Sequence, residues 1–351
     1  MSATSNPDRL VIPRGYNEII EPRETERAIL RIKESFQTNL AFELNLVRVT
    51  APLFVESGTG INDDLNGSER PVSFPVRHLR EQHAEIVQSL AKWKRLTLAE
   101  LAFAPGEGIY ADMNAVRPDE ELDNTHSLYV DQWDWELVIE PQQRTRAFLE
   151  TTVRRIYDVI RRSERYICHE YRGLDHYLPE QITIVHSQEL LDRYPELSPR
   201  EREREICREY GAVFVAGIGA PLSDGKPHDG RAPDYDDWIS RGEDGSQGLN
   251  GDILVHNRVL DAPFELSSMG IRVDSQSLQQ QLALAGAAER AELYFHRRLL
   301  DGELPLCIGG GIGQSRLCML YLQKAHIGEI QASLWPRDHV ERCRAAGIHL
   351  L

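Results

Sequence analysis

A glycine-rich segment near the C-terminus has residue types that suit a phosphate-bearing or planar ligand. It runs Cys307-Ile-Gly-Gly-Gly-Ile-Gly-Gln-Ser-Arg316. Glycines let a ligand approach the backbone where any Cβ would collide. The apolar residues that follow predict a buried helix, with Arg316 about one turn inside it. Its guanidinium could bind phosphate or stack on a base near the positive helix N-terminus. A purely structural glycine turn is the alternative.

Two common nucleotide-binding motifs do not fit this segment. A P-loop requires Gly-Lys followed by Ser or Thr, and no such triplet follows these glycines. A dinucleotide fingerprint requires an opening βαβ unit, which the preceding sequence does not predict. The segment alone therefore does not identify its ligand.

Two acidic residues lie inside apolar segments that predict neighbouring antiparallel strands. Asp252 lies in residues 249–255 and Glu265 in residues 264–273. Buried carboxylates need a cationic partner, and Mg²⁺ prefers hard oxygen ligands of this kind. We therefore expect Asp252 and Glu265 to hold a magnesium ion.

A third strand-like segment, residues 127–136, alternates polar and aromatic residues. A period of two places Gln132, Asp134 and Glu136 on one face, with Trp133 and Trp135 on the other. Three hydrogen-bonding groups on one face favour a polar ligand there over simple core packing.

Three further segments could contribute to a site, although each has an ordinary structural explanation. Residues 57–70 carry Asp63 and Asp64, and residues 217–238 mix Gly, Asp and His. Both segments suit either a ligand-gripping loop or a solvated turn. Residues 89–95 place cationic groups beside Trp93, which on its own is more typical of a surface edge.

The elements that would position these residues follow from periodicity. Apolar spacings of three and four predict a helix from Glu24 to about Asn45, and a β-rich segment follows it at residues 46–54, with Pro52 at an edge or strand end. We expect a strand at residues 212–216 and further helices at residues 144–165, 198–210, 275–285 and 287–300. Residues 1–22 are predicted to form a loosely attached extension, residues 23–351 a single domain, and the C-terminal tail to fray.

Composition limits the partners of the chain. The net charge of -15 argues against a broad nucleic-acid surface. The five cysteines are odd in number and widely spaced, which suits reduced thiols in a cytosol. No run of about 18 apolar residues is present, so we expect no membrane span and a cytoplasmic location.

Several motifs together resemble the class II aminoacyl-tRNA synthetases. The helix, strand and Pro52 resemble the first, dimer-forming motif of that class; Arg117-x-x-Glu120 resembles the second, and the segment from Gly309 to Arg316 the third. The closing Trp335-Pro-Arg resembles the end of an aspartyl-type catalytic core.

The resemblance to one related family, the ammonia-dependent asparagine synthetases or aspartate–ammonia ligases, is closer. It covers residues 24–337 and is nearly verbatim in five segments, residues 89–95, 130–136, 231–238, 249–255 and 264–274. It implies an α+β fold with a class II synthetase-like core, in which helices flank a large antiparallel sheet, and a homodimer. It also implies that L-aspartate, ammonia and ATP form asparagine, AMP and diphosphate.

The resemblance assigns roles by position. Arg117 and Arg316 match the arginines that bind the ATP phosphates and adenine, Glu120, Gly311 and Gly313 belong to the same ATP-binding motifs, and Asp252 and Glu265 match Mg²⁺-holding acids. Asp236 matches a position important for activity. The implied aspartate pocket comprises Ser89, Lys94, Gln132, Asp134, Ser268 and Arg272. We hypothesise that Asp63 positions or deprotonates ammonium.

The nitrogen donor can be argued from the residues. A glutamine-using enzyme needs an activated thiol, yet Met1 precedes Ser2 and no cysteine stands in a Gly-x-Cys-x-Gly context. Free ammonia is therefore expected. Two alternatives remain, a synthetase paralogue that transfers the acyl group to tRNA or protein, and a non-catalytic sensor on the same fold. Against the first, fewer than 25 residues precede the core; against the second, the phosphate arginines and acidic residues are present.

Overall fold

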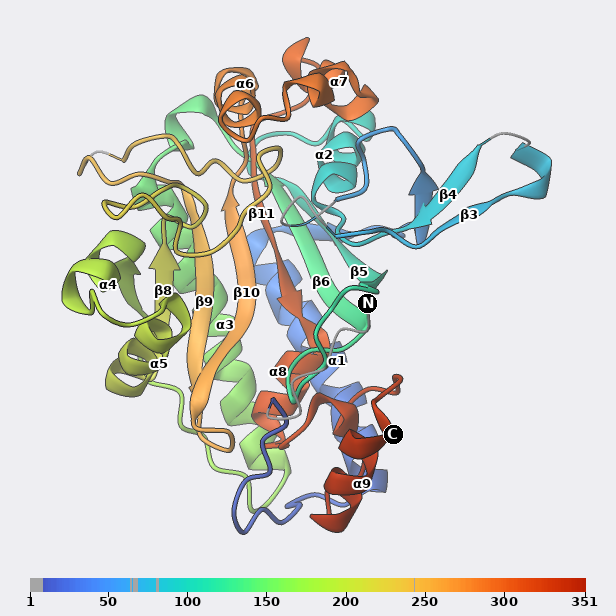
Figure 1. Cartoon of the computed structure of the whole chain (residues 1–351), viewed down its shortest axis with the longest axis vertical. Coiled ribbons are helices and arrows are strands. Elements are labelled where there is room, and N and C mark those ends of the chain that lie inside the picture. The colour runs from blue at the N-terminus through green and yellow to red at the C-terminus, as the bar shows by residue number, and fades with distance from the viewer. Residues whose placement is uncertain (1–8, 64, 66–68, 80–81, 243) are drawn as a thin grey trace.

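The molecule is organised around one large sheet with helices packed against both of its faces (Figure 1). The computed structural model describes residues 9–63, 65, 69–79, 82–242 and 244–351. Asp64 and residues 1–8 of the predicted extension lie outside this range.

The large sheet has eight strands in the order β1-β5-β6-β11-β10-β9-β8-β7. Their bounds are β1 Leu46–Arg48, β5 Gly108–Val116, β6 Tyr129–Val138, β7 Thr183–His186, β8 Ala212–Ala216, β9 Asn250–Asn257, β10 Ala262–Ile271 and β11 Cys307–Gly313. Neighbouring strands run antiparallel from β5 through to β8, and the pairs β1/β5 and β7/β8 at the two edges are parallel. The prediction of an antiparallel sheet is thus confirmed for the strands from β5 to β8. The parallel pairs at the two edges make the whole sheet mixed.

A second, three-stranded sheet extends away from the body (Figure 1). It pairs β2 Phe54–Glu56, β4 His83–Ile86 and β3 Ser73–Pro75 in that order. The β-rich segment expected at residues 46–54 therefore divides, because Leu46 starts an edge strand of the large sheet and Phe54 starts a strand of the small one.

The helices have the following bounds: α1 Pro22–Leu44, α2 Ala91–Glu100, α3 Arg146–Glu170, α4 Ser187–Arg193, α5 Pro199–Tyr210, α6 Ser275–Leu284, α7 Tyr294–Leu300, α8 Gln314–Tyr321 and α9 Arg337–Ala345. Two ends follow from local sequence. Asn45 ends α1 in the left-handed conformation with φ 56°, and a capping box between Ser198 and Glu201 opens α5. The helix expected at residues 287–300 is instead a 3₁₀ helix, Ala288–Glu292, followed by α7, because extended Leu293 separates them.

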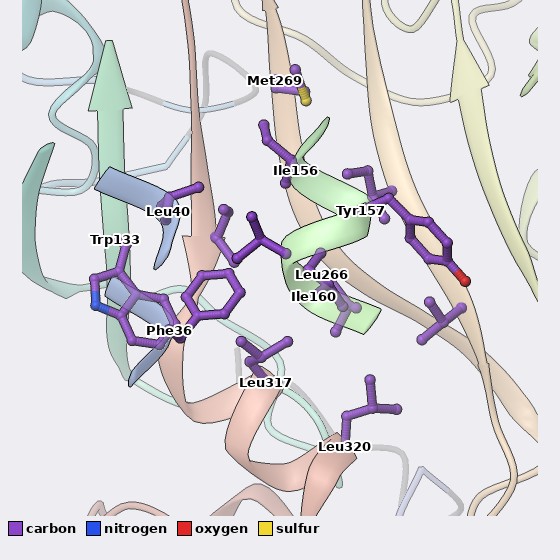
Figure 2. Packing of buried hydrophobic residues seen from close by; sticks show 14 of the residues in the cluster. Phe36, Leu40, Trp133, Ile156, Tyr157, Ile160, Leu266, Met269, Leu317 and Leu320 are labelled. Carbon is purple, nitrogen blue, oxygen red and sulfur yellow. The ribbon is translucent and has the colours of Figure 1, made fainter. Parts of the chain in front are cut away.

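The main core lies between the sheet and three helices. Figure 2 shows Phe36 and Leu40 of α1, Ile156 and Ile160 of α3, and Leu317 and Leu320 of α8 packed around Trp133 of β6 and Leu266 of β10. Trp133 and Trp135 are completely buried in this layer. Since successive strand residues point to opposite faces, Gln132, Asp134 and Glu136 face the other side of the sheet, as the alternation predicted.

The two chain ends are held against each other, which the sequence did not predict. Leu10, Cys343 and Ile348 share a small buried cluster, and the Tyr16 hydroxyl donates to Glu329 at 2.8 Å. The expectations of a loose attachment at residues 9–22 and of a frayed tail are therefore wrong. Contacts between such distant segments leave no local sequence pattern.

Candidate active site

A cavity of about 330 Å³ opens on the face of the sheet opposite the main core. It is lined by β6, β9, β10 and β11, the starts of α2 and α8, and the loops that carry residues 117–120 and 229–236. The sequence-predicted residues that line it are Ser89, Arg117, Glu120, Gln132, Asp134, Asp236, Asp252, Glu265, Ser268, Arg272, Gly311, Gly313 and Arg316. The structure thus brings together residues from positions 89 to 316.

The glycine run forms a strand rather than a turn. Gly309, Gly310 and Gly311 belong to β11, which lies between β6 and β10. A Cβ on Gly311 would collide with the Gln132 side-chain amide, and one on Gly310 would lie 2.6 Å from the Ser268 carbonyl oxygen. These glycines therefore make room for side chains of neighbouring strands and keep the cavity floor open.

We expect Gly309→Ala to be destabilising. The added Cβ would collide with the Glu136 carboxylate and lie 2.6 Å from the Arg272 guanidinium, and these two groups are fixed by mutual hydrogen bonds. Overpacking of this kind costs about 2–3 kcal/mol. Gly286→Ala is the control, since a Cβ there meets nothing within 4 Å and only its positive φ of 67° adds strain. Chemical denaturation of both variants measures the difference, and equal losses would contradict the collision.

Alternating charges form a buried network beneath the cavity. Arg272 donates two hydrogen bonds of 2.8 Å to the Glu136 carboxylate and a third to Asp236. Lys94 contacts Asp134 and lies 3.5 Å from Glu136. Burial alone would raise the pKa of Glu136, but the charges of Arg272 and Lys94 outweigh burial and hold it at about 2. Glu136 therefore stays ionised and fixes both cations.

Arg231 continues the network toward the predicted metal ligands. Its guanidinium donates to Asp252 and to the Ser268 hydroxyl, each at 2.7 Å, and lies 3.6 Å from Asp236. Burial opposes the charged form, yet the nearby carboxylates, Asp252 foremost, raise the pKa of Arg231. A permanently charged group thus stands between the predicted aspartate-binding Ser268 and the predicted metal ligand Asp252.

The two phosphate-binding candidates reach the cavity from different elements. Arg117 directly follows β5, and its Nη2 donates to the Gln88 carbonyl at 3.3 Å. Arg316 lies in the first turn of α8, donates to the Glu265 carbonyl at 3.1 Å and lies 3.6 Å from the Glu265 carboxylate. Two guanidinium groups in one cavity suit a polyphosphate chain.

The predicted metal ligands lie on neighbouring strands. Asp252 of β9 is opposite Ser268 of β10, and Glu265 lies nearer the other end of β10. Both carboxylates line the cavity. Two carboxylates in the same cavity as the two predicted phosphate-binding arginines suit Mg²⁺, which takes one or two protein carboxylates and fills its other positions with water and phosphate oxygens. Asp252 and Glu265 are the residues that would hold it.

Two sequence-predicted residues lie outside the lining of this cavity. The Lys94 ammonium group is completely buried and donates to the carbonyl oxygens of Trp135 and Gly310, at 2.9 and 3.2 Å, in addition to contacting Asp134. Asp63 lines a second, neighbouring cavity instead. Lys94 does not line the main cavity itself, but it contacts Asp134 and Gly310, which do.

Gln88, Arg231 and Tyr235 are among the residues that line the main cavity but were not predicted as site residues from the sequence. The Gln88 side chain is fully buried, and neither of its amide atoms has a hydrogen-bond partner within the described residues. Nothing in the apolar stretch around Gln88 indicated a polar role. Arg231 could have been found, because it begins the motif at residues 231–238 that supported the resemblance.

Solved structures share this architecture. The asparaginyl-tRNA synthetase of Pyrococcus horikoshii, complexed with asparaginyl-adenylate, aligns with a TM-score of 0.65 at 15% identity, covering 89% of this chain and 70% of that one. An asparaginyl-tRNA synthetase of Entamoeba histolytica aligns with a TM-score of 0.63 at 13% identity, covering 88% and 67%. At these identities the likeness shows the fold, which is that of class II synthetases.

Sequence relatives are much closer. The aspartate–ammonia ligase of Bacteroides thetaiotaomicron is 57% identical over 342 residues, covering 97% of this chain and 99% of that protein. The aspartate–ammonia ligase of Clostridium perfringens is 54% identical over 344 residues, covering 98% and 100%. The family model for aspartate–ammonia ligases matches residues 23–347. This chain belongs to the aspartate–ammonia ligase family.

Proposed function

We propose that this protein makes asparagine by ATP-dependent amidation of L-aspartate with free ammonia. One observation carries the proposal. A single cavity is lined by Arg117, Arg316, Asp252 and Glu265 and also by polar side chains of β6 and β10. Full-length similarity to aspartate–ammonia ligases agrees with it.

The chemistry requires activation of a carboxylate that is inert toward amines. Attack of the aspartate side-chain carboxylate on the α-phosphorus of ATP gives β-aspartyl-adenylate and diphosphate. Ammonia then attacks the acyl carbon, and AMP leaves. Positioned cations matter more than a nucleophilic side chain in such a transfer. Arg117 and Arg316 would bind the phosphates, and bound Mg²⁺ would neutralise charge that develops on them.

The aspartate pocket would be built on β6 and β10. Ser89, Gln132, Asp134 and Ser268 offer hydrogen-bonding groups to the substrate, and Arg272 offers a cation for its α-carboxylate. The glycines 311 and 313 and Glu120 would contact ATP. Lys94 would act through Asp134, and Asp236 would orient Arg272 and Arg231, which it contacts from the 231–238 loop.

The decisive experiment mixes the purified protein with aspartate, Mg-ATP and ammonium and follows asparagine and AMP. The proposal expects both products in equal amounts without tRNA. Formation of ADP instead of AMP would exclude the adenylate. A requirement for tRNA or an acceptor protein would instead indicate acyl transfer, and no turnover at all would indicate a sensor.

We expect Asp252→Asn to raise the Mg²⁺ concentration needed for half-maximal asparagine formation by roughly tenfold or more, because a neutral amide is a weaker magnesium ligand than a carboxylate. Asp261→Asn is the matched control, since Asp261 lies in the turn between β9 and β10 and pairs with surface Arg208. Magnesium titrations at saturating substrates give the comparison. Identical magnesium curves for the wild type and Asp252→Asn would remove Asp252 from the metal site.

We further propose a homodimer and a cytoplasmic location. Large apolar side chains are exposed along the first motif, notably Phe42 of α1 at 89% and Val47 of β1 at 58%, and a second copy of the chain could cover them. Sedimentation velocity tests the dimer.

All five cysteines are free thiols, which suits a reducing compartment. Across the described residues, the helices lack the combination of length and apolar character that a bilayer span requires.

A further inference from the structure

A second cavity of about 190 Å³ adjoins the first, and nothing in the activation of aspartate uses it. It lies between the small sheet, the start of α2 and α7, in the part of the molecule that Figure 1 shows beside β4 and α2. Among the described residues, its charged lining comprises four acids and two cations, Glu56, Asp63, Glu85, Asp234, Lys92 and Arg290. An excess of carboxylates favours a small cation over an anion.

Asp234 provides an oxygen for such a cation. This residue is fully buried, and its Oδ2 accepts from Lys92 at 3.1 Å and from Arg290 at 3.4 Å and lies 3.0 Å from Nε2 of His296. Within the described residues, its other oxygen, Oδ1, has no hydrogen-bond partner. Nδ1 of His296 is likewise buried and unpartnered among them. Buried polar atoms without partners are rare and point to a ligand.

The wall between the two cavities is thin, because three segments line both. Asp63 lines the second cavity and Leu65 the first; Lys92 lines the second and Ala91 the first; Asp234 lines the second and Tyr235 the first. The backbone N–H of Gln88, in the first cavity, donates to Oδ1 of Asn62, in the second, at 2.9 Å. Burial and then the charge of Asp63 raise the pKa of Tyr235, which places Asp63 within electrostatic range of that wall residue.

We propose that the second cavity binds the ammonium ion and supplies ammonia to the aspartate site across this wall. Ammonium is a small cation with four N–H donors, which suits Asp234 Oδ1 and the neighbouring carboxylates. Asp63, the hypothesised proton acceptor, lines the same cavity. One N–H bond breaks, the proton moves to the Asp63 carboxylate, and nitrogen keeps the electron pair with which it attacks the activated acyl carbon.

The inference rests on the proposed function. It places aspartate and ATP in one cavity and ammonium in the other. Aspartate and ATP would fill the first cavity, so ammonium that arrived by the same opening would have to pass both substrates. Separate access through the second cavity avoids that obstruction.

Two variants test the second cavity. Leu293→Trp fills it without changing charge, because Leu293 lines it, and Asp234→Asn removes the proposed ligand charge. We expect both to raise the KM for ammonium by about tenfold or more, with rescue at high ammonium. Aspartate-dependent exchange of diphosphate into ATP, measured without ammonium, should stay within about twofold of wild type in Leu293→Trp, since activation occurs in the first cavity. Leu284→Trp is the control, because Leu284 is 69% exposed on α6 and lines neither cavity.

The outcomes separate the two proposals. An unchanged ammonium KM in Leu293→Trp, with an active wild type, overturns the ammonium site and leaves the ligase function intact. A loss of exchange in parallel with amidation in that variant also overturns it, because the cavity would then serve activation. A wild type that makes neither asparagine nor AMP removes the function itself.

Discussion

Replacement of Arg117 by alanine is expected to reduce aspartate-dependent exchange of diphosphate into ATP by roughly 10³-fold. Arg117 lines the main cavity, and Nε of its guanidinium is buried without a hydrogen-bond partner among the described residues. That N–H donor is therefore free to meet a phosphate oxygen on which charge develops during attack. Loss of such a donor acts on the transition state, so kcat should fall more than the affinity for ATP.

Two further variants make the Arg117 result specific. Arg117→Lys keeps the charge but loses the planar fork, so an intermediate loss is expected. Arg208→Ala removes an arginine that pairs with Asp261 at the surface, and its exchange rate should equal that of the wild type. A loss below tenfold in Arg117→Ala would show that Arg117 does not stabilise the transferring phosphate.

Local sequence patterns predicted much of the framework. The alternation in residues 127–136 placed Trp133 and Trp135 in the core and Gln132 and Asp134 in the cavity lining, because the period of a strand fixes its two faces. The helix expected from Glu24 to about Asn45 is α1, and the strands predicted around Asp252 and Glu265 pair as an antiparallel β9/β10 ladder.

Elements that depend on distant partners were not predictable in this way. The segment at residues 46–54 divides between two sheets because Leu46 pairs with Gly108 and Phe54 with Ile86, and neither partner is visible locally. The C-terminal helix α9 is mostly polar, and its Cys343 is buried in a cluster that includes Leu10 from the other end of the chain.

The roles of the site residues were hard to predict for the same reason, because their ion-pair partners are distant in the sequence. The motif resemblance implied that Lys94 and Arg272 anchor the substrate, and both are cations near the sheet. The structure adds that Asp134 and Glu136 hold Lys94, while Glu136 and Asp236 hold Arg272. The carboxylates around a cation decide whether it contacts a ligand or positions a neighbouring side chain. These carboxylates lie 40 or more positions away in the sequence for Lys94, and 36 or more for Arg272.

Glu136→Gln is expected to lower the free energy of unfolding by about 3 kcal/mol. The Glu136 carboxylate is fully buried, accepts two hydrogen bonds from Arg272, lies 3.5 Å from Lys94 and accepts from the Cys307 thiol at 3.0 Å. A glutamine would turn an N–H donor toward Arg272 or Lys94 and would leave two buried cations with one carboxylate fewer. Because Arg272 would lose its bidentate partner, the KM for aspartate should rise as well.

The pH dependence of the free energy of unfolding at acidic pH gives a second test of Glu136→Gln. The pKa of Glu136 is about 2 in the folded chain, below the ordinary value of 4.5. The unfolded chain therefore binds a proton first as pH falls, so the stabilisation by Glu136 is complete above pH 4.5 and is lost as pH falls toward 2. Guanidinium unfolding across this window should show a shallower pH dependence in Glu136→Gln. Glu303→Gln, at an exposed pair with Arg298, should behave as wild type. If Glu136→Gln kept the wild-type slope and stability, the buried network would not be what holds Arg272 in the cavity.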